Sequence, residues 1–171
     1  TVSGPREDLE ELREALDRDG LDAQLVPIDI AAHSSLVEPL LEPFEAYLRS
    51  VELRPPTIPF LSNLTGTWIT DDEATDPAYW AAHLRGTVRF ADDVRTVLRD
   101  RRPFFLEVGP GRILSSLVKL SDPASAGRVA PTMRHPRESV DDREALLGAV
   151  ARAWVQGNEV PWGRIREEAP V

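Results

Sequence analysis

The chain has 171 residues, 20 basic and 29 acidic side chains, a formal net charge of −9 and no cysteine. The acidic balance, with no basic cluster, argues against a nucleic-acid partner. The lack of thiols excludes disulfides, cysteine metal sites and thiol catalysis. No apolar run reaches the roughly 20 residues of a membrane span, so we expect no membrane partner, and the absence of cysteine favours a cytoplasmic protein.

The first part of the chain predicts alternating helices and strands. An amphipathic helix is expected over 6–19, because its leucines recur at helical spacing. The elements expected after it are a strand over 23–30, a helix over 40–51, a strand over 58–62 and a turn at 64–67. This order, after an entering strand, is typical of a small α+β sandwich.

The later part of the chain reads as helices around one apolar strand. The run 104–108 is continuously apolar and ends at Gly109-Pro110-Gly111, which predicts a buried parallel strand and a tight turn. We expect that strand to be buried on both faces, and the chain alone to be marginally stable unless a partner completes the sheet. The other expected elements are helices near 77–84, 88–98, 113–118 and 146–154, a linker over 121–127 and a strand over 128–133.

A histidine stands at a corner after the strand predicted over 23–30. The segment reads Ile28-Asp29-Ile30-Ala31-Ala32-His33-Ser34-Ser35, so hydroxyl residues follow His33 directly. A histidine there can act as a general base, because its ordinary pKa lies near neutrality. From spacing alone, a structural histidine bonded to the backbone is the commoner case.

Seven motifs in register resemble a known family. The resemblance is to the acyltransferase domain of modular polyketide synthases, a relative of malonyl-CoA:acyl carrier protein transacylase. Each motif is weak alone, but together they extend over nearly the whole chain. The motifs include Val2-Ser3-Gly4-Pro5, Ala31-Ala32-His33-Ser34, Pro59-Phe60-Leu61-Ser62-Asn63-Leu64-Thr65-Gly66, Asp76-Pro77-Ala78-Tyr79-Trp80, His83-Leu84-Arg85, Val88-Arg89-Phe90 and Leu106-Glu107-Val108-Gly109-Pro110-Gly111.

The resemblance implies an α/β fold in three parts. Residues 1–66 would form an incomplete ferredoxin-like small subdomain of α+β type. Residues 67–120 would form the C-terminal part of an α/β-hydrolase-like core. Residues 121–171 would be the linker that follows such domains.

The resemblance also implies a chemistry. Such domains move an extender acyl unit, malonyl or methylmalonyl, from coenzyme A to the phosphopantetheine thiol of an acyl carrier protein. They use a Ser-His ping-pong mechanism in polyketide biosynthesis, and His33 would be its base. The family's serine lies in a Gly-His-Ser-x-Gly elbow upstream of the histidine, and no Gly-x-Ser-x-Gly occurs in these residues.

We therefore expect this chain to be the C-terminal part of such a domain and to be inactive alone. The expected partners are the missing N-terminal part that carries the serine, an acyl carrier protein and a neighbouring ketosynthase domain. Coenzyme A thioester and carrier phosphopantetheine enter as substrates, with no cofactor bound directly. Asp71-Asp72-Glu73 lacks histidine or cysteine partners, so we expect a solvated turn there and no metal.

Four further residues are candidates for substrate contact by resemblance: Ile30, Ala31, Ala32 and His83. The first three fall on the family's selectivity tetrapeptide, which tends to read His-Ala-Phe-His for malonyl and Tyr-Ala-Ser-His for methylmalonyl. Ala32 leaves open the space that a phenylalanine would fill, which favours a pocket that admits an α-methyl branch; alternatively, the alanines only let the strand pack closely. The segment around His83 is expected to offer a backbone carbonyl to His33, while the His83 ring itself is more often a surface group.

Two other classes stay open. The chain can be a non-catalytic docking or structural piece of a synthase, or a fragment of an unrelated α/β hydrolase. The hydrolase alternative needs a carboxylate partner for His33, and no acidic residue is obviously placed for that role.

Overall fold

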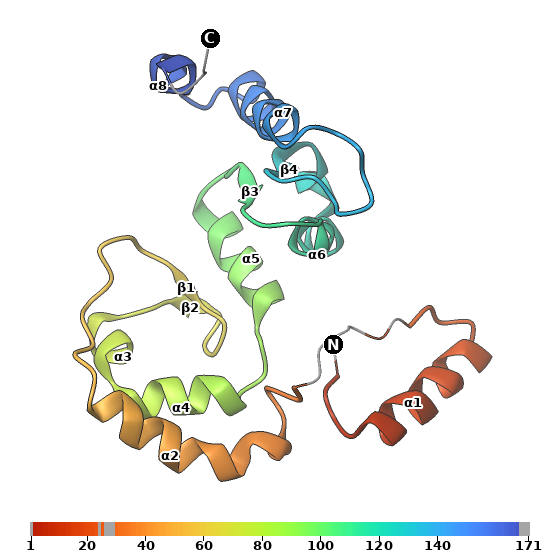
Figure 1. Ribbon diagram of the computed structural model, residues 1–171, viewed down its shortest axis with the longest axis vertical. Coiled ribbons are helices and arrows are strands. Elements are labelled where there is room, and N and C mark those ends of the chain that lie inside the picture. The colour runs from red at the N-terminus through yellow and green to blue at the C-terminus, as the bar shows by residue number, and fades with distance from the viewer. Residues whose placement is uncertain (1, 24, 26–29, 168–171) are drawn as a thin grey trace. The chain divides into compact units, whose positions relative to one another are not determined.

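The computed structural model describes residues 2–23, 25 and 30–167. The chain divides into two compact units, Thr1–Asp93 and Val94–Val171. Helices predominate and two small sheets accompany them (Figure 1), which confirms the predicted α/β class. The boundaries predicted at 66 and 120 do not coincide with the division after Asp93, so the three-part organisation stays a prediction.

The first unit is built mainly from helices. The strand predicted over 23–30 falls largely on residues 24 and 26–29, which lie outside the described residues. Its elements are α1 (Arg6–Arg18), the 3₁₀ helix η1 (Ser35–Val37), α2 (Glu38–Arg49), β1 (Leu61–Ser62), β2 (Thr67–Trp68), α3 (Asp71–Thr75) and α4 (Pro77–Arg85). Helix α5 (Phe90–Asp100) begins in this unit and continues into the second.

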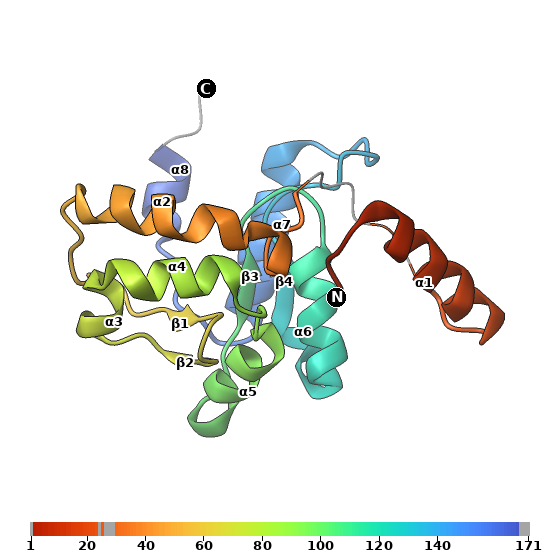
Figure 2. The same cartoon turned by 90° about the horizontal axis from the view of Figure 1, so that it is seen from below.

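Helices α2 and α4 lie side by side in both views (Figures 1 and 2) and make the main helix contact of this unit. Ala81 of α4 is buried, whereas Leu40 of α2 is 57% exposed. An ion pair between the Arg85 Nε and Glu38 Oε1 atoms, 3.0 Å apart, joins the two helices. The helix pair therefore brings the start of α2 next to the C-terminal end of α4.

Local hydrogen bonds define where α3 and α4 begin. Thr70 and Glu73 form a capping box at the start of α3, so the acidic run expected as a solvated turn is the first helical turn. The Asp76 side chain caps α4, and Pro77 occupies its first turn, where a missing N–H costs nothing. Among the described residues, no group of three His, Asp or Glu side chains is arranged to hold a metal ion.

The β1–β2 hairpin turns at Gly66 and is tied to α4. Gly66 has φ +74°, and a Cβ there would lie 2.6 Å from the Asp92 Cβ, so both the turn and the close approach require glycine. The Ser62 hydroxyl shares a hydrogen bond with the Tyr79 hydroxyl and accepts the Leu64 N–H at 3.1 Å. These contacts fix the hairpin against α4.

The second unit contains a two-stranded parallel sheet with helices around it. Phe105 pairs with Val129, Leu106 with Ala130 and Glu107 with Pro131. The elements are β3 (Phe105–Glu107), α6 (Ile113–Ser121), the 3₁₀ helix η2 (Pro123–Arg128), β4 (Val129–Pro131), α7 (Asp142–Val155) and α8 (Trp162–Glu167). Within the described part of the chain, no helix is long and apolar enough to cross a membrane.

The burial expected for the strand over 104–108 is wrong for this structure. Leu106 is 48% exposed and Val108 is 85% exposed. Among the described residues this sheet has two strands, so β3 and β4 each leave one edge without a neighbouring strand.

Candidate active site

The corner predicted around His33 forms just before η1. Ser34 is the N-cap of η1: its Oγ accepts the Leu36 N–H at 3.3 Å and donates to the Ala31 carbonyl at 2.7 Å. Ser34 is buried, at 9% exposure. Because its hydroxyl is already donated to a carbonyl, Ser34 is not poised as a nucleophile for the neighbouring His33.

His33 is held by two hydrogen bonds to the end of α4. Its backbone N–H donates to the Leu84 carbonyl at 3.1 Å, one of the carbonyls that a helix leaves free at its C-terminus. Its Nδ1 lies 2.8 Å from the Gly86 carbonyl oxygen. A carbonyl can only accept, so the network assigns the proton to Nδ1 and leaves a lone pair on Nε2.

The His33 backbone is strained. Its φ of +62° makes it the one described non-glycine residue with a positive φ. Such a conformation costs on the order of 1–3 kcal/mol and persists where neighbouring contacts impose it. The bonds to Leu84 and Gly86 are contacts of this kind.

Gly86 supplies the acceptor that orients the base. A Cβ at Gly86 would lie 2.5 Å from the Leu64 Cδ1 and 3.0 Å from the Ala82 carbonyl oxygen. Leu64 therefore packs directly onto the glycine whose carbonyl receives the Nδ1–H of His33. The sequence predicted an acceptor from the segment of His83 and Leu84; the structure provides Leu84 for the backbone N–H and Gly86 for the ring.

The His83 ring lies beside the His33 ring. The two ring centroids are 6.0 Å apart at an interplanar angle of 78°, and the Trp80 and His83 centroids are 5.8 Å apart at 57°. Burial, and after it the charge of His33, lowers the pKa of His83 below its ordinary value. His83 was a candidate for substrate contact, and its nearest aromatic neighbours are the candidate base and a tryptophan.

The other predicted contact residues lead into the corner. Ile30 is 71% exposed, while Ala31 and Ala32 are half-buried. Ser34, Ser35 and Leu36 line one side of a hollow of about 420 Å³, whose other side is formed by the N-terminal segment and α1. Ala31 and Ala32 precede His33 directly in the chain, and neither is among the residues that line this hollow.

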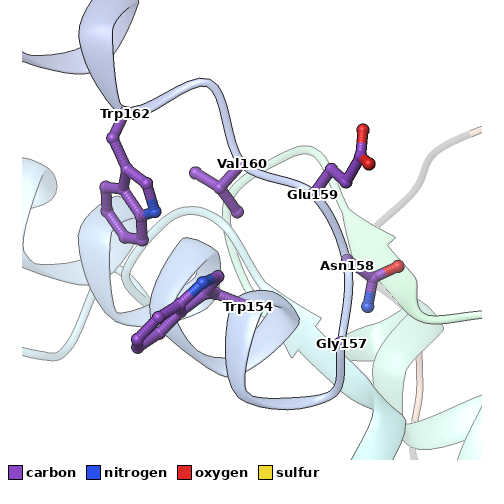
Figure 3. Close-up of a pocket in the computed structure, with 6 residues that line it drawn as sticks. All are labelled: Trp154, Gly157, Asn158, Glu159, Val160 and Trp162. Carbon is purple, nitrogen blue, oxygen red and sulfur yellow. The ribbon is translucent and has the colours of Figure 1, made fainter.

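A second hollow, of about 460 Å³, lies in the second unit (Figure 3). The Trp154 and Trp162 rings meet edge to face there with centroids 5.9 Å apart. Its one ionisable lining residue is Glu159, whose carboxylate points away from the indoles in Figure 3. No histidine and no hydroxyl side chain is among its lining residues, so the His33 corner is the better candidate for chemistry.

Sequence reasoning missed Asp93. This side chain is 6% exposed, and its Oδ1 has no hydrogen-bond partner among the described residues. Burial, then the nearby Asp92, raises the pKa of Asp93, while Arg89 opposes the shift. The sequence places Asp93 in the first turn of α5 beside Asp92, where acidic residues are common and usually exposed. Nothing in the sequence therefore indicated that this side chain is buried.

Comparison with known proteins assigns the chain to a family. Residues 1–160 match the family described as acyl transferase domain. The chain belongs to this family. Its relatives are polyketide synthases, which agrees with the resemblance found in the sequence motifs.

Similar full-length proteins are much longer than this chain. A phenolphthiocerol/phthiocerol polyketide synthase of Mycobacterium tuberculosis is 37% identical over 170 residues, which are 99% of this chain and 11% of that protein. Spectinabilin polyketide synthase system protein NorA of Streptomyces orinoci is 35% identical over 162 residues, 94% of this chain and 8% of that protein. The acyltransferase chain thus spans about a tenth of these relatives.

Solved acyltransferase domains share the fold. The acyl transferase domain of ZmaA is 37% identical with a TM-score of 0.82, and the match covers 98% of this chain and 38% of that one. The acyl transferase domain of SpnD, in complex with 2-(pent-4-yn-1-yl)malonyl, is also 37% identical with a TM-score of 0.82, over 90% of this chain and 38% of that one. The chain therefore spans less than half the length of these solved domains.

Proposed function

We propose that this chain is part of a polyketide synthase acyltransferase in which His33 is the general base. The observation that carries the proposal is the Nδ1–H bond of His33 to the Gly86 carbonyl, which frees Nε2 to accept a proton. A neutral imidazole with its second nitrogen anchored is what a Ser-His pair requires. Membership of the acyl transferase family supplies the reaction class.

The reaction then runs in two half-reactions. As a serine oxygen attacks the thioester carbonyl of the acyl-CoA, Nε2 of His33 takes the serine proton. The carbon–sulfur bond breaks, and the departing coenzyme A thiolate takes that proton from His33. The phosphopantetheine thiol of the carrier protein next gives its proton to His33 and attacks the acyl-serine, and the serine oxygen leaves with the proton.

We propose that the serine comes from polypeptide outside these 171 residues. No Gly-x-Ser-x-Gly occurs in the sequence. Ser34, the serine next to His33 in the chain, has its hydroxyl committed to the Ala31 carbonyl. The 171-residue chain alone should accordingly form no acyl adduct with malonyl-CoA. The acyl carrier protein and a neighbouring ketosynthase are the partners that this role requires.

The acyl unit proposed is a malonyl group that can carry an α-substituent. Ala31 and Ala32 are half-buried and small, so they leave room beside the base. The related SpnD domain is described with a malonyl group that carries a pentynyl chain, which is a bulky α-substituent. One methyl in such a pocket is worth about 1–3 kcal/mol, which bounds the discrimination between malonyl and methylmalonyl.

Intact-mass analysis of the full-length protein that contains this chain tests the proposal. The parent protein should gain an acyl adduct from malonyl-CoA or methylmalonyl-CoA and pass it to a carrier protein. His33→Ala should slow both steps by about 10²–10⁴-fold, the usual contribution of a general base. His135→Ala is the matched control, because His135 lies in the second unit, where its Nδ1 accepts the Arg137 N–H. Equal rates in the two variants would remove His33 from the mechanism.

A further inference from the structure

We propose that His83 is a positioning residue for His33, and this inference rests on the function proposed above. The ring of His83 fixes the orientation of the His33 imidazole about its side-chain torsion. The two rings are 6.0 Å apart and nearly perpendicular, which is the edge-to-face geometry that aromatic pairs favour. The bond from Nδ1 to the Gly86 carbonyl holds one edge of the His33 ring. The His83 ring makes a second, edge-to-face contact with the same ring.

The His83 ring is itself held from behind. Trp80 and His83 are spaced i, i+3 on α4, so their side chains lie on the same face of the helix. Their centroids are 5.8 Å apart, and the Trp80 indole N–H donates to the Ala74 carbonyl of α3 at 3.0 Å. Tyr79 meets the Trp80 ring edge to face at 5.7 Å.

The contacts form a continuous row of rings, Tyr79–Trp80–His83–His33. We call these four residues the aromatic row. Its first member shares a hydrogen bond with Ser62 of the β1–β2 hairpin, and its second is bonded to α3. The row therefore connects two fixed elements of the first unit to the candidate base.

The inference assigns a different role to His83 than direct contact with substrate. A positioning residue changes how often the base is correctly aimed, and so it alters kcat. It leaves substrate affinity unchanged, and KM reports that affinity when chemistry is slow relative to substrate dissociation. Misplacement of a catalytic group by about 1 Å can cost up to about 10²-fold in rate, and partial loosening of one ring should cost about tenfold.

The test uses the full-length protein with His83→Ala and His83→Phe. His83→Ala should lower kcat for acyl transfer about tenfold with KM within twofold of the parent, because the ring beside His33 is gone. His83→Phe keeps a planar ring and should restore kcat to within threefold of the parent. Imidazole ¹⁵N spectra of histidine-labelled protein should show His33 as the Nδ1–H tautomer in the parent and in His83→Phe, and a mixture of tautomers in His83→Ala.

The outcomes separate this inference from the proposed function. If His33→Ala abolishes transfer but His83→Ala matches the parent in kcat and tautomer, His83 has no positioning role and the base assignment stands. If His33→Ala itself transfers normally, the proposed function fails. If His83→Ala raises KM more than it lowers kcat, His83 contacts substrate and the inference is overturned. If His83→Ala does not fold, His83→Phe decides: a folded His83→Phe with kcat near that of the parent supports the ring contact, and one with low kcat contradicts it.

Discussion

Replacing Glu107 with alanine removes the cap of helix α6. No side chain at the usual N-cap position, Arg112, satisfies the first N–H groups of this helix. Instead the Glu107 carboxylate reaches across the glycine-containing turn from β3 and accepts the N–H groups of Leu114 at 3.0 Å and Ser115 at 2.9 Å. Without Glu107, two N–H groups at the start of α6 lose their acceptor.

The size of the effect follows from those two bonds. A hydrogen bond to a charged group contributes roughly 1.5–3 kcal/mol net. The Leu114 bond is exposed and the Ser115 bond is partly buried, so we take the lower end for each and expect Glu107→Ala to lower the free energy of unfolding by about 2–4 kcal/mol. Glu107→Gln keeps one acceptor oxygen but loses the charge that favours a helix N-terminus, which should cost about half as much.

Urea denaturation followed by tryptophan fluorescence measures this difference, because Trp154 lies in the same unit as Glu107. Glu159→Ala is the matched control: Glu159 is exposed in that unit, and this change should stay within about 0.5 kcal/mol of the parent. A Glu107→Ala protein as stable as the Glu159→Ala control would refute the capping argument.

Three further changes have defined outcomes. Gly86→Ala should lower kcat for acyl transfer about tenfold, because the new Cβ would press on Leu64 and displace the carbonyl that orients His33; steady-state kinetics measures this, and an unchanged kcat contradicts it. Asp93→Asn should raise the free energy of unfolding at neutral pH. Burial raises the pKa of Asp93 in the folded state, which means that the fold favours the protonated carboxyl over the carboxylate. The contribution of this side chain to the stability of the protein is therefore fully present below the unfolded pKa and is lost as pH rises through the folded pKa. The gain should vanish in urea titrations below about pH 4, and a gain that persists there argues against burial as the cause. Ala32→Phe should reduce transfer of methylmalonyl relative to malonyl by about 10–100-fold in competition assays, and an unchanged ratio would remove Ala32 from the pocket.

Local sequence signals predicted the longer helices. Leucine spacing located α1, and the apolar periodicity of the later part located α6 and α7. The sequence did not predict helix α8, whose Trp162 ring contacts the Trp154 ring of α7. The short 3₁₀ helix η2 was expected as a linker, because its Pro and Gly residues carry no periodic pattern.

The sequence predicted the candidate base but not its support. His33 is marked by its position after a strand-like run. Its ring acceptor is a backbone carbonyl 53 residues away in the chain, at Gly86, and a backbone group has no side-chain signature. The left-handed φ of His33 is equally hidden, because a positive φ is uncommon for any residue other than glycine and depends here on the contacts with α4.

The rate of acyl-serine formation in a single turnover tests the central claim most directly. His33→Gly is the most informative variant, because glycine adopts the positive φ of this position without strain while the imidazole is lost. The account predicts that the full-length variant forms the acyl adduct about 10²–10⁴-fold more slowly than the parent, and that added imidazole restores part of the rate. Adduct formation at the parent rate without added imidazole would contradict the assignment of His33 as the base.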